Sequence, residues 1–216
     1  LLFERIPPKP STLLHLPSDL AAIRPVSEPA EPSYRILDEE TITPRIQLLG
    51  NGNYSLMITN AGSGYSRWRD IEIGRWRSDA TRDPWGMFFY VREEGRLEPW
   101  SITHQPSGVQ DSGYSVIYGP DRAEFHRTRD GIEAQVEVIV SPEDDAEIRR
   151  VTLSTQSPRD RLIELTSAME LSLARHEADR AHPGFNKLFI QTEARPDLQA
   201  VIAWRRSRSP SDSPVW

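Results

Sequence analysis

Three short segments of this 216-residue chain concentrate aromatic, arginine and acidic residues in a pattern that suits the binding of a hydroxyl-rich ligand. Aromatic faces stack on the apolar faces of sugar rings, while guanidinium, carboxylate and amide groups exchange hydrogen bonds with hydroxyls. The segments are GSGYSRWRD at residues 62–70, RWRSDATRDPWG at 75–86 and EPWSITHQPSG at 98–108. Their candidate carbohydrate-binding residues are Tyr65, Trp68, Arg69, Asp70, Arg82, Asp83, Trp85, His104 and Gln105.

Two structural interpretations compete with ligand binding for these segments. Gly62 and Gly64 permit backbone angles that other residues avoid, so the first segment is also typical of a tight turn between strands. The arginines and aspartates could equally form an internal network that holds the loops together. Both alternatives remain open at the level of sequence.

The chain shows none of the common catalytic or metal-binding signatures. It has no cysteine, phosphate-binding loop, dinucleotide fingerprint, nucleophile elbow or zinc-protease helix. His176, Asp179 and His182 recur at intervals of three, but Pro183 follows directly and solvated loop histidines are the favoured interpretation. We therefore predict no catalytic residue, no metal and no cofactor in this chain.

Composition argues against nucleic acid as a partner and against a membrane-spanning segment. The net charge is −6 and both signs are mixed along the chain, so no basic face invites nucleic acid. No apolar stretch approaches the roughly 20 residues needed to cross a bilayer. The absence of cysteine excludes disulfides and favours a reducing compartment. We expect a cytoplasmic domain that binds no nucleic acid.

The elements that must position the three segments follow a period of two. Tyr54, Leu56 and Ile58 alternate with Ser55, Met57 and Thr59, and similar alternation runs through 133–140 and through LIELTSAMELSL at 162–173. Turn clusters separate these runs, which predicts an antiparallel β-sandwich. LARHEADRAHPGF, at 173–185, is the one stretch inside the body that favours a helical turn or a long loop.

Proline marks the predicted domain boundary. Seven prolines fall within residues 7–32, which cannot hold a long helix or a central strand. We predict that residues 1–33 are a proline-rich linker from an upstream module and that 34–216 form the β-domain. The polar, proline-containing end, SRSPSDSPVW, predicts that the β-domain is incomplete at its carboxyl-terminal end.

Six segments, taken in order, carry a resemblance to a known family. They are QLLGNGNYSLMITNAGSGYSRWRD, TRDPWGMFFYVRE, WSITHQPSG, VSPEDDAEIRRVTLS, ELTSAMELSLA and AHPGFNKLFIQTE. The series resembles the amino-terminal β-supersandwich domain of glycoside hydrolase family 94, which contains cellobiose phosphorylase and cyclic β-1,2-glucan synthase. The resemblance implies an all-β, antiparallel supersandwich of the galactose-mutarotase-like kind.

The resemblance also implies a function. In this family an (α/α)6 barrel after the supersandwich carries the catalytic acid, so this domain is expected to be non-catalytic. The nine candidate residues would then bind carbohydrate or brace the cleft of that barrel. The expected partners are the barrel of the same chain and, through the parent enzyme, a β-glucan oligosaccharide. A homodimer and a parent attached to the inner membrane, with this domain on the cytoplasmic side, also agree with this interpretation.

Two other functions remain open. One is an independent carbohydrate-binding module, and the other is a purely structural or dimerisation domain. The exposure of Trp68, Trp85 and Trp100 separates them, because a shared open face favours binding and burial favours a structural role.

Overall fold

The computed structural model describes residues 33–36, 43–79, 83–109 and 113–207. The predicted linker at 1–33 therefore lies outside the described residues, except for residue 33. Arg82 also lies outside them. Within the described ranges, no helix is long and apolar enough to cross a membrane.

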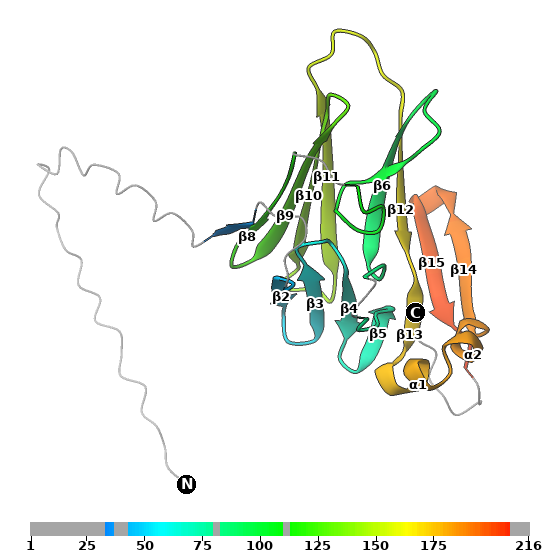
Figure 1. Ribbon diagram of the computed structural model, residues 1–216. Coiled ribbons are helices and arrows are strands. Elements are labelled where there is room, and N and C mark those ends of the chain that lie inside the picture. Colours follow the sequence, from blue (N-terminus) through cyan, green and yellow to red (C-terminus); the bar gives the residue numbers. More distant parts are fainter. Residues whose placement is uncertain (1–32, 37–42, 80–82, 110–112, 208–216) are drawn as a thin grey trace, which may run out of the picture. The chain divides into compact units, whose positions relative to one another are not determined.

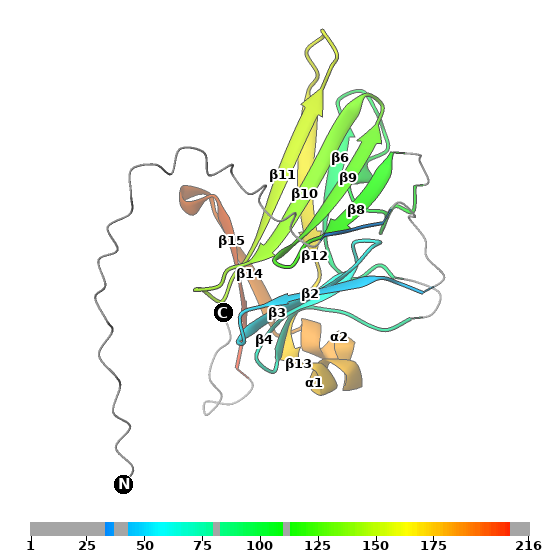
Figure 2. The ribbon, with the colours of Figure 1, turned by 90° about the vertical axis from the view of Figure 1, so that its left-hand side faces the viewer.

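Four antiparallel sheets build the domain, which confirms the predicted all-β class (Figures 1 and 2). The first sheet has the order β1-β8-β9-β10-β11, with bounds Tyr34–Ile36, Tyr114–Tyr118, Arg122–Arg129, Ile132–Val140 and Glu147–Thr155. The second has the order β13-β5-β4-β3-β2, with bounds Leu171–Arg175, Ile71–Gly74, Gly64–Trp68, Tyr54–Thr59 and Ile46–Gly50.

Two smaller sheets and two short helices complete the described part of the chain. The third sheet has the order β12-β6-β7, with bounds Ile163–Met169, Met87–Glu93 and Trp100–Ser101. The fourth pairs β14, Ile190–Arg195, with β15, Ala200–Arg205. Helices α1, His176–Ala181, and α2, Pro183–Lys187, occupy most of the stretch at 173–185 for which a helical turn or a long loop was predicted.

The period-two pattern produces the core. Ile132, Ala134, Val136 and Val138 alternate along β10 and are all buried. Their cluster includes residues of the first three sheets, with Phe125, Leu56 and Val91 among its fully buried members. The first sheet therefore shares one core with the second and third sheets.

The apolar run at 162–173 forms two strands in different sheets rather than one. β12 ends at Met169 and β13 begins at Leu171, so the break falls at Glu170. The Glu170 carbonyl accepts the Arg75 amide at 2.7 Å, and its carboxylate pairs with the Arg75 guanidinium. Leu165 on β12 stays 44% exposed. The alternation predicted the strands but not the break between them, which lies at the residue that contacts Arg75.

A polar bridge at the start of β11 joins the sheets. The Glu147 carboxylate accepts the hydroxyls of Tyr54 at 3.1 Å and Ser66 at 2.6 Å, both from the second sheet. It also pairs with Arg149 at 3.0 Å, and Arg149 donates to the Met87 carbonyl of β6 at 2.8 Å. Burial, followed by the charge of Glu147, raises the pKa of Tyr54, so its hydroxyl stays a donor.

A buried ion cluster fastens α1 and α2 to the second sheet. Arg75, at the end of β5, binds both carboxylate oxygens of Asp179, at 3.0 and 2.6 Å. Both side chains are almost fully buried, at 1% and 0% exposure. Arg77 also pairs with Asp179, and Asn186 of α2 donates to the same carboxylate at 2.7 Å. Four polar groups therefore meet at one buried position.

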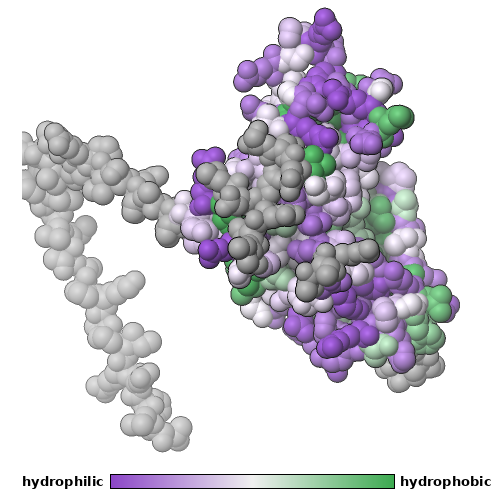
Figure 3. Space-filling view, in the orientation of Figure 1, coloured by the Kyte–Doolittle hydropathy of each residue, from purple (hydrophilic) through white to green (hydrophobic). Residues whose placement is uncertain are grey.

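Apolar side chains on α2 and the β15 hairpin stay exposed. Phe185 is 50% exposed, Leu188 70% and Val201 71%. The space-filling view shows apolar residues on this part of the surface (Figure 3). This region gains less from burial than the main core, so its attachment depends more on the buried ion cluster.

We expect Asp179→Ala to destabilise the domain by about 3–5 kcal/mol, because it leaves Arg75 buried without its bidentate partner. Asp70→Ala is the matched control, since Asp70 pairs with Arg175 at 2.8 Å where both side chains are more than half exposed. Urea unfolding of both variants measures the two costs. Equal stabilities for the two variants would contradict a structural role for the cluster.

Candidate functional site

Three loops meet beside the start of β4 and β6, and we call them the loop cluster. They comprise residues 59–64, 83–86 and 101–108. The Gly64 amide donates to the Trp85 carbonyl at 2.8 Å, and the Gln105 amide donates to the Ala61 carbonyl at 2.8 Å. The Ser63 hydroxyl donates to the Asp83 carbonyl at 2.5 Å. The three predicted segments therefore do contribute to one place in the fold.

Close packing explains the two glycines of the first loop. Gly62 has φ +92°, and a Cβ there would lie 2.3 Å from the Thr103 Cβ. A Cβ on Gly64 would lie 1.9 Å from the Met57 carbonyl oxygen. Both distances are too short for any other residue. The glycines thus serve the contact between loops as well as the turn, and they hold the cluster rigid.

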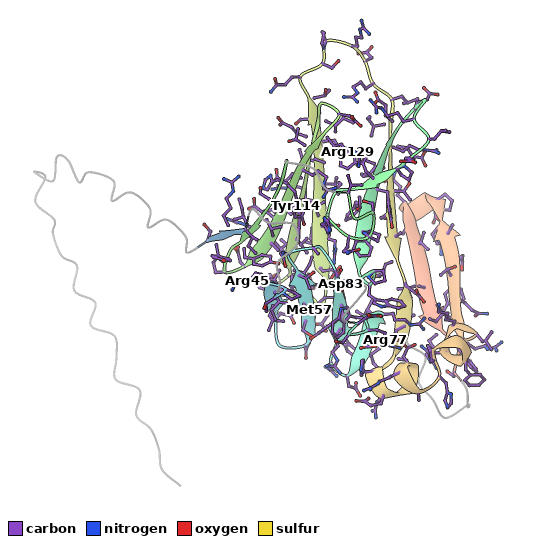
Figure 4. All side chains as sticks on the ribbon, in the orientation of Figure 1. Arg45, Met57, Arg77, Asp83, Tyr114 and Arg129 are labelled. Atoms are coloured by element: carbon purple, nitrogen blue, oxygen red, sulfur yellow. The ribbon has the colours of Figure 1, made fainter. Side chains whose placement is uncertain are left out.

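Asp83 (Figure 4) and Trp85 are partly buried members of the cluster, and both come just before β6 in the sequence. Burial raises the pKa of the Asp83 carboxyl, and the neighbouring Ser63 and Thr59 hydroxyls oppose that shift. A carboxyl whose charge is opposed by its surroundings lowers stability and is a candidate functional group. Trp85, a partly buried indole two residues further along the same loop, is the aromatic group of this segment that could stack on a sugar.

His104 and Gln105 shape the third loop. His104 is only 1% exposed, and its ring lies 6.5 Å from that of Tyr114. The Tyr114 hydroxyl donates to the Asn60 carbonyl at 2.6 Å, which ties β8 to the first loop. Gln105 is half-buried, and its carbonyl accepts the Thr103 hydroxyl at 2.7 Å. Of these two predicted residues, only Gln105 reaches the surface of the cluster.

Trp68, Arg69 and Asp70 lie at the other end of β4. The strand has five residues, so its ends are about 13 Å apart. Trp68 Nε1 donates to the Asp145 carboxylate at 2.6 Å, and the Arg69 guanidinium stacks 4.6 Å above the Trp68 ring. Together with the Asp70–Arg175 pair, these contacts form a separate group that holds the end of β4 to the turn before β11.

Tyr65 belongs to neither group. Its ring packs against Trp76 at 5.9 Å, with 60° between the planes. The neighbouring side chain on β4, Ser66, faces the Glu147 bridge. Successive strand residues face opposite sides, so Tyr65 and Trp76 lie on the outer face of the second sheet.

The three tryptophans do not share one open face. Trp100 is 5% exposed and belongs to the core, whereas Trp68 and Trp85 are partly buried in separate groups. This arrangement offers no single aromatic platform built from all three residues.

Sequence reasoning missed the small polar residues that lock the loops. Ser63 of the first loop donates to Asp83 of the second, Thr103 of the third loop packs against Gly62 of the first, and Ser101 and Ser107 share a hydrogen bond of 2.5 Å within the third loop. The clustering of these residues in TNAGSG and SITHQPS is a signal for side-chain bonds to the backbone. That signal was available, but the contacts of Ser63 and Thr103 with other loops could not be predicted from it.

The structure gives side-chain partners to His176 and Asp179, two of the three residues considered for metal binding. Asp179 binds Arg75 and Arg77, and His176 Nδ1 lies 2.5 Å from Glu72. Among the described residues, no group of three or more histidine, aspartate and glutamate side chains could hold a metal ion.

The chain is similar in sequence to several enzymes of known function. The chain is 38% identical over 178 residues to the cyclic beta-(1,2)-glucan synthase NdvB of Rhizobium meliloti (strain 1021), covering 82% of this chain and 6% of that protein. It is 27% identical over 170 residues to the N,N'-diacetylchitobiose phosphorylase of Vibrio proteolyticus, covering 76% and 21%. It is 35% identical over 100 residues to the solabiose phosphorylase of Paenibacillus borealis, covering 46% and 13%.

The chain spans between 6% and 21% of the length of these relatives. The family model described as "Glycosyl hydrolase 94, supersandwich domain" matches residues 32–216. The antiparallel sheets agree with that description, and the match confirms the resemblance drawn from the six sequence segments. The chain therefore belongs to glycoside hydrolase family 94, as a supersandwich domain.

Proposed function

We propose that this chain is the non-catalytic supersandwich domain of a larger enzyme that makes or trims a β-glucan. In this proposal a catalytic barrel in the same polypeptide carries out the reaction, and the loop cluster lines or braces the sugar-binding cleft. The names of the relatives support a carbohydrate substrate, since they include a glucan synthase and two disaccharide phosphorylases. The 38% identity to the synthase favours a β-1,2-linked glucan.

One observation carries the assignment of the loop cluster. Three loops are locked together by backbone bonds and by glycine contacts, yet they keep an aspartate whose burial opposes its charge. A loop used only as a connection has no physical reason to retain such a group. Interlocked loops with one carboxyl whose burial opposes its charge and one partly buried indole suit the shaping of a sugar site.

The structure favours bracing over an independent binding module. Trp100 lies in the core, and Trp68 donates to Asp145 within the same domain. We propose that Asp83, Trp85 and Gln105 face the cleft, and that Trp68, Arg69 and Asp70 brace the sheet behind it. Tyr65 then supports the outer face through Trp76. The same proposal places the domain in the cytoplasm, on a parent enzyme attached to the inner membrane.

We expect Trp85→Ala and Asp83→Asn, introduced into the longer enzyme, to lower the rate of phosphorolysis of β-1,2-glucan oligosaccharides by about tenfold to a hundredfold. That range corresponds to the loss of one stacking or charge-assisted contact, about 1–3 kcal/mol. Asp197→Asn is the matched control for Asp83→Asn, because Asp197 lies in the turn between β14 and β15, away from the loop cluster, in an exposed pair with Arg195. Rates are expressed per folded molecule and compared with melting temperatures.

If Trp85→Ala and Asp83→Asn both show a normal rate per folded molecule, the proposed role of the loop cluster in the cleft is wrong. A rate that falls only in proportion to the loss of folded protein would show that the cluster acts on stability alone.

The raised pKa of Asp83 gives a second test, on the isolated chain. Its folded-state pKa lies above the unfolded value of 3.8, so ionisation opposes folding as the pH rises through these two values. We expect Asp83→Asn to raise the melting temperature near neutral pH, and the gain to shrink as the pH falls toward 3.8. A loss of stability at every pH would show instead that hydrogen bonds to the carboxylate outweigh its burial.

A further inference from the structure

A groove opens between the edges of the first and second sheets. It is lined by Tyr34 of β1, by residues 44–47 at the start of β2 and by residues 118–120 at the end of β8. Its volume is about 560 Å³, within the range of small-molecule sites. Neither the loop cluster nor the buried ion cluster contributes to its lining.

Two tyrosines, Tyr34 and Tyr118, line the groove. Tyr34 pairs with Tyr118 in the register of β1 and β8, so the two side chains lie next to each other on one face of the sheet. Tyr118 is 6% exposed, and its hydroxyl donates to the Arg45 carbonyl at 3.3 Å. Tyr34 is 53% exposed although its neighbour on the same face, Ile36, is in the core. The Tyr34 ring is therefore available to a ligand.

Polar groups in the groove have unused hydrogen-bonding capacity. Within the described part of the chain, the Arg45 guanidinium has neither a hydrogen bond nor an ion pair, although the Arg45 amide donates to Asn60 at 3.0 Å. Gln47 Nε2 donates to the Gly119 carbonyl at 2.7 Å, which fixes that side chain across the groove. No described residue donates to the Gln47 amide oxygen. The groove thus offers a fixed acceptor and a free, planar donor.

We propose that this groove binds a neutral β-linked glucose oligosaccharide, at a site separate from the loop cluster. An exposed aromatic ring beside a guanidinium and an amide matches the alternation of apolar faces and hydroxyls on a sugar chain. An anionic ligand fits less well, because the groove has a single free guanidinium and the whole chain carries a net charge of −6.

The position of the groove suggests what the site does. Arg45 lies at the edge of the second sheet (Figure 4), and its backbone is bound on both sides by Asn60, which belongs to the first loop of the loop cluster. The groove and the loop cluster are thus fixed to each other by this residue. The proposal rests on the proposed function, and it assigns the groove to a part of the glucan beyond the units that the loop cluster contacts.

The test is calorimetric titration of the 216-residue chain with a linear β-1,2-linked glucose pentasaccharide. Pentasaccharides with β-1,4 and α-1,4 linkages and inorganic phosphate serve as comparison probes. We expect a dissociation constant on the order of 1 mM for the wild type. Tyr34→Ala and Arg45→Ala should each raise it about tenfold, whereas Tyr34→Phe keeps the ring and should bind as the wild type does.

Arg35→Ala is the matched control for Arg45→Ala. Arg35 is exposed on β1, but it lies on the opposite face of the strand from Tyr34 and does not line the groove. All the substituted side chains are exposed, so circular dichroism and melting temperature should remain those of the wild type. A loss of binding in Tyr34→Ala and Arg45→Ala, with normal binding in Arg35→Ala, supports the proposal.

Five results would overturn the proposal. Four are the absence of binding by the wild type, unchanged binding in Tyr34→Ala, an equal loss in Arg35→Ala, and displacement of the sugar by inorganic phosphate. The fifth is loss of binding in Trp85→Ala with normal binding in the groove variants, which would place the sugar at the loop cluster instead. That last result overturns the groove while supporting the proposed function, so the two failures are distinguishable.

Discussion

The start of β11 is the point on which the arrangement of the sheets depends. Glu147 accepts two hydroxyls from the second sheet, and Arg149 beside it reaches the backbone of β6 in the third. An apolar core alone would hold the sheets together without fixing how they are aligned, because hydrophobic burial has no direction. The carboxylate supplies that direction, since it must satisfy its hydrogen bonds at a largely buried position.

The turn before β11 extends the same constraint to the surface. The Asn51 side chain donates to the carbonyls of Ser141 and Asp144, and Trp68 donates to Asp145. The turns at 50–53 and 141–146 are therefore held together, and the end of β4 is held with them. Trp68, which the sequence suggests as a ligand contact, instead makes a structural hydrogen bond within the domain. Because β4 is a short strand, its start, where the loop cluster forms, then lies at a fixed distance from the turn at 141–146.

Two kinds of charged group matter for the fold and for the proposed sites. Arg75, Asp179, Glu147 and Arg149 are buried and paired, so they serve the fold. Asp83 is held where its charge is opposed, and Arg45 has no partner among the described residues. The first kind explains how a supersandwich with exposed strands stays assembled. The second kind lies at the two places where we propose that a carbohydrate binds.

Much of the fold was predictable from the sequence. Period-two alternation predicted the strands, because successive side chains of a strand face opposite sides of a sheet, and turn residues predicted their ends. The helical segment at 173–185 was recognised because the alternation stops there. The ordered motifs predicted the family, which the match over residues 32–216 confirms.

The composition of the candidate site was visible in the sequence, but its grouping was not. From residue type alone, sugar recognition was an equally good prediction for four residues that the structure places differently: Tyr65, Trp68, Asp83 and His104. Only the tertiary structure showed that His104 is buried in the core whereas Asp83 is partly buried in a loop. It also showed that Trp68 makes a structural contact with Asp145. The physical reason is that Trp68 and Asp145 are 77 residues apart, and Arg75 and Asp179 are 104 apart. Local pattern determines which face of an element is apolar, whereas the partner of a polar group is decided by how the sheets pack.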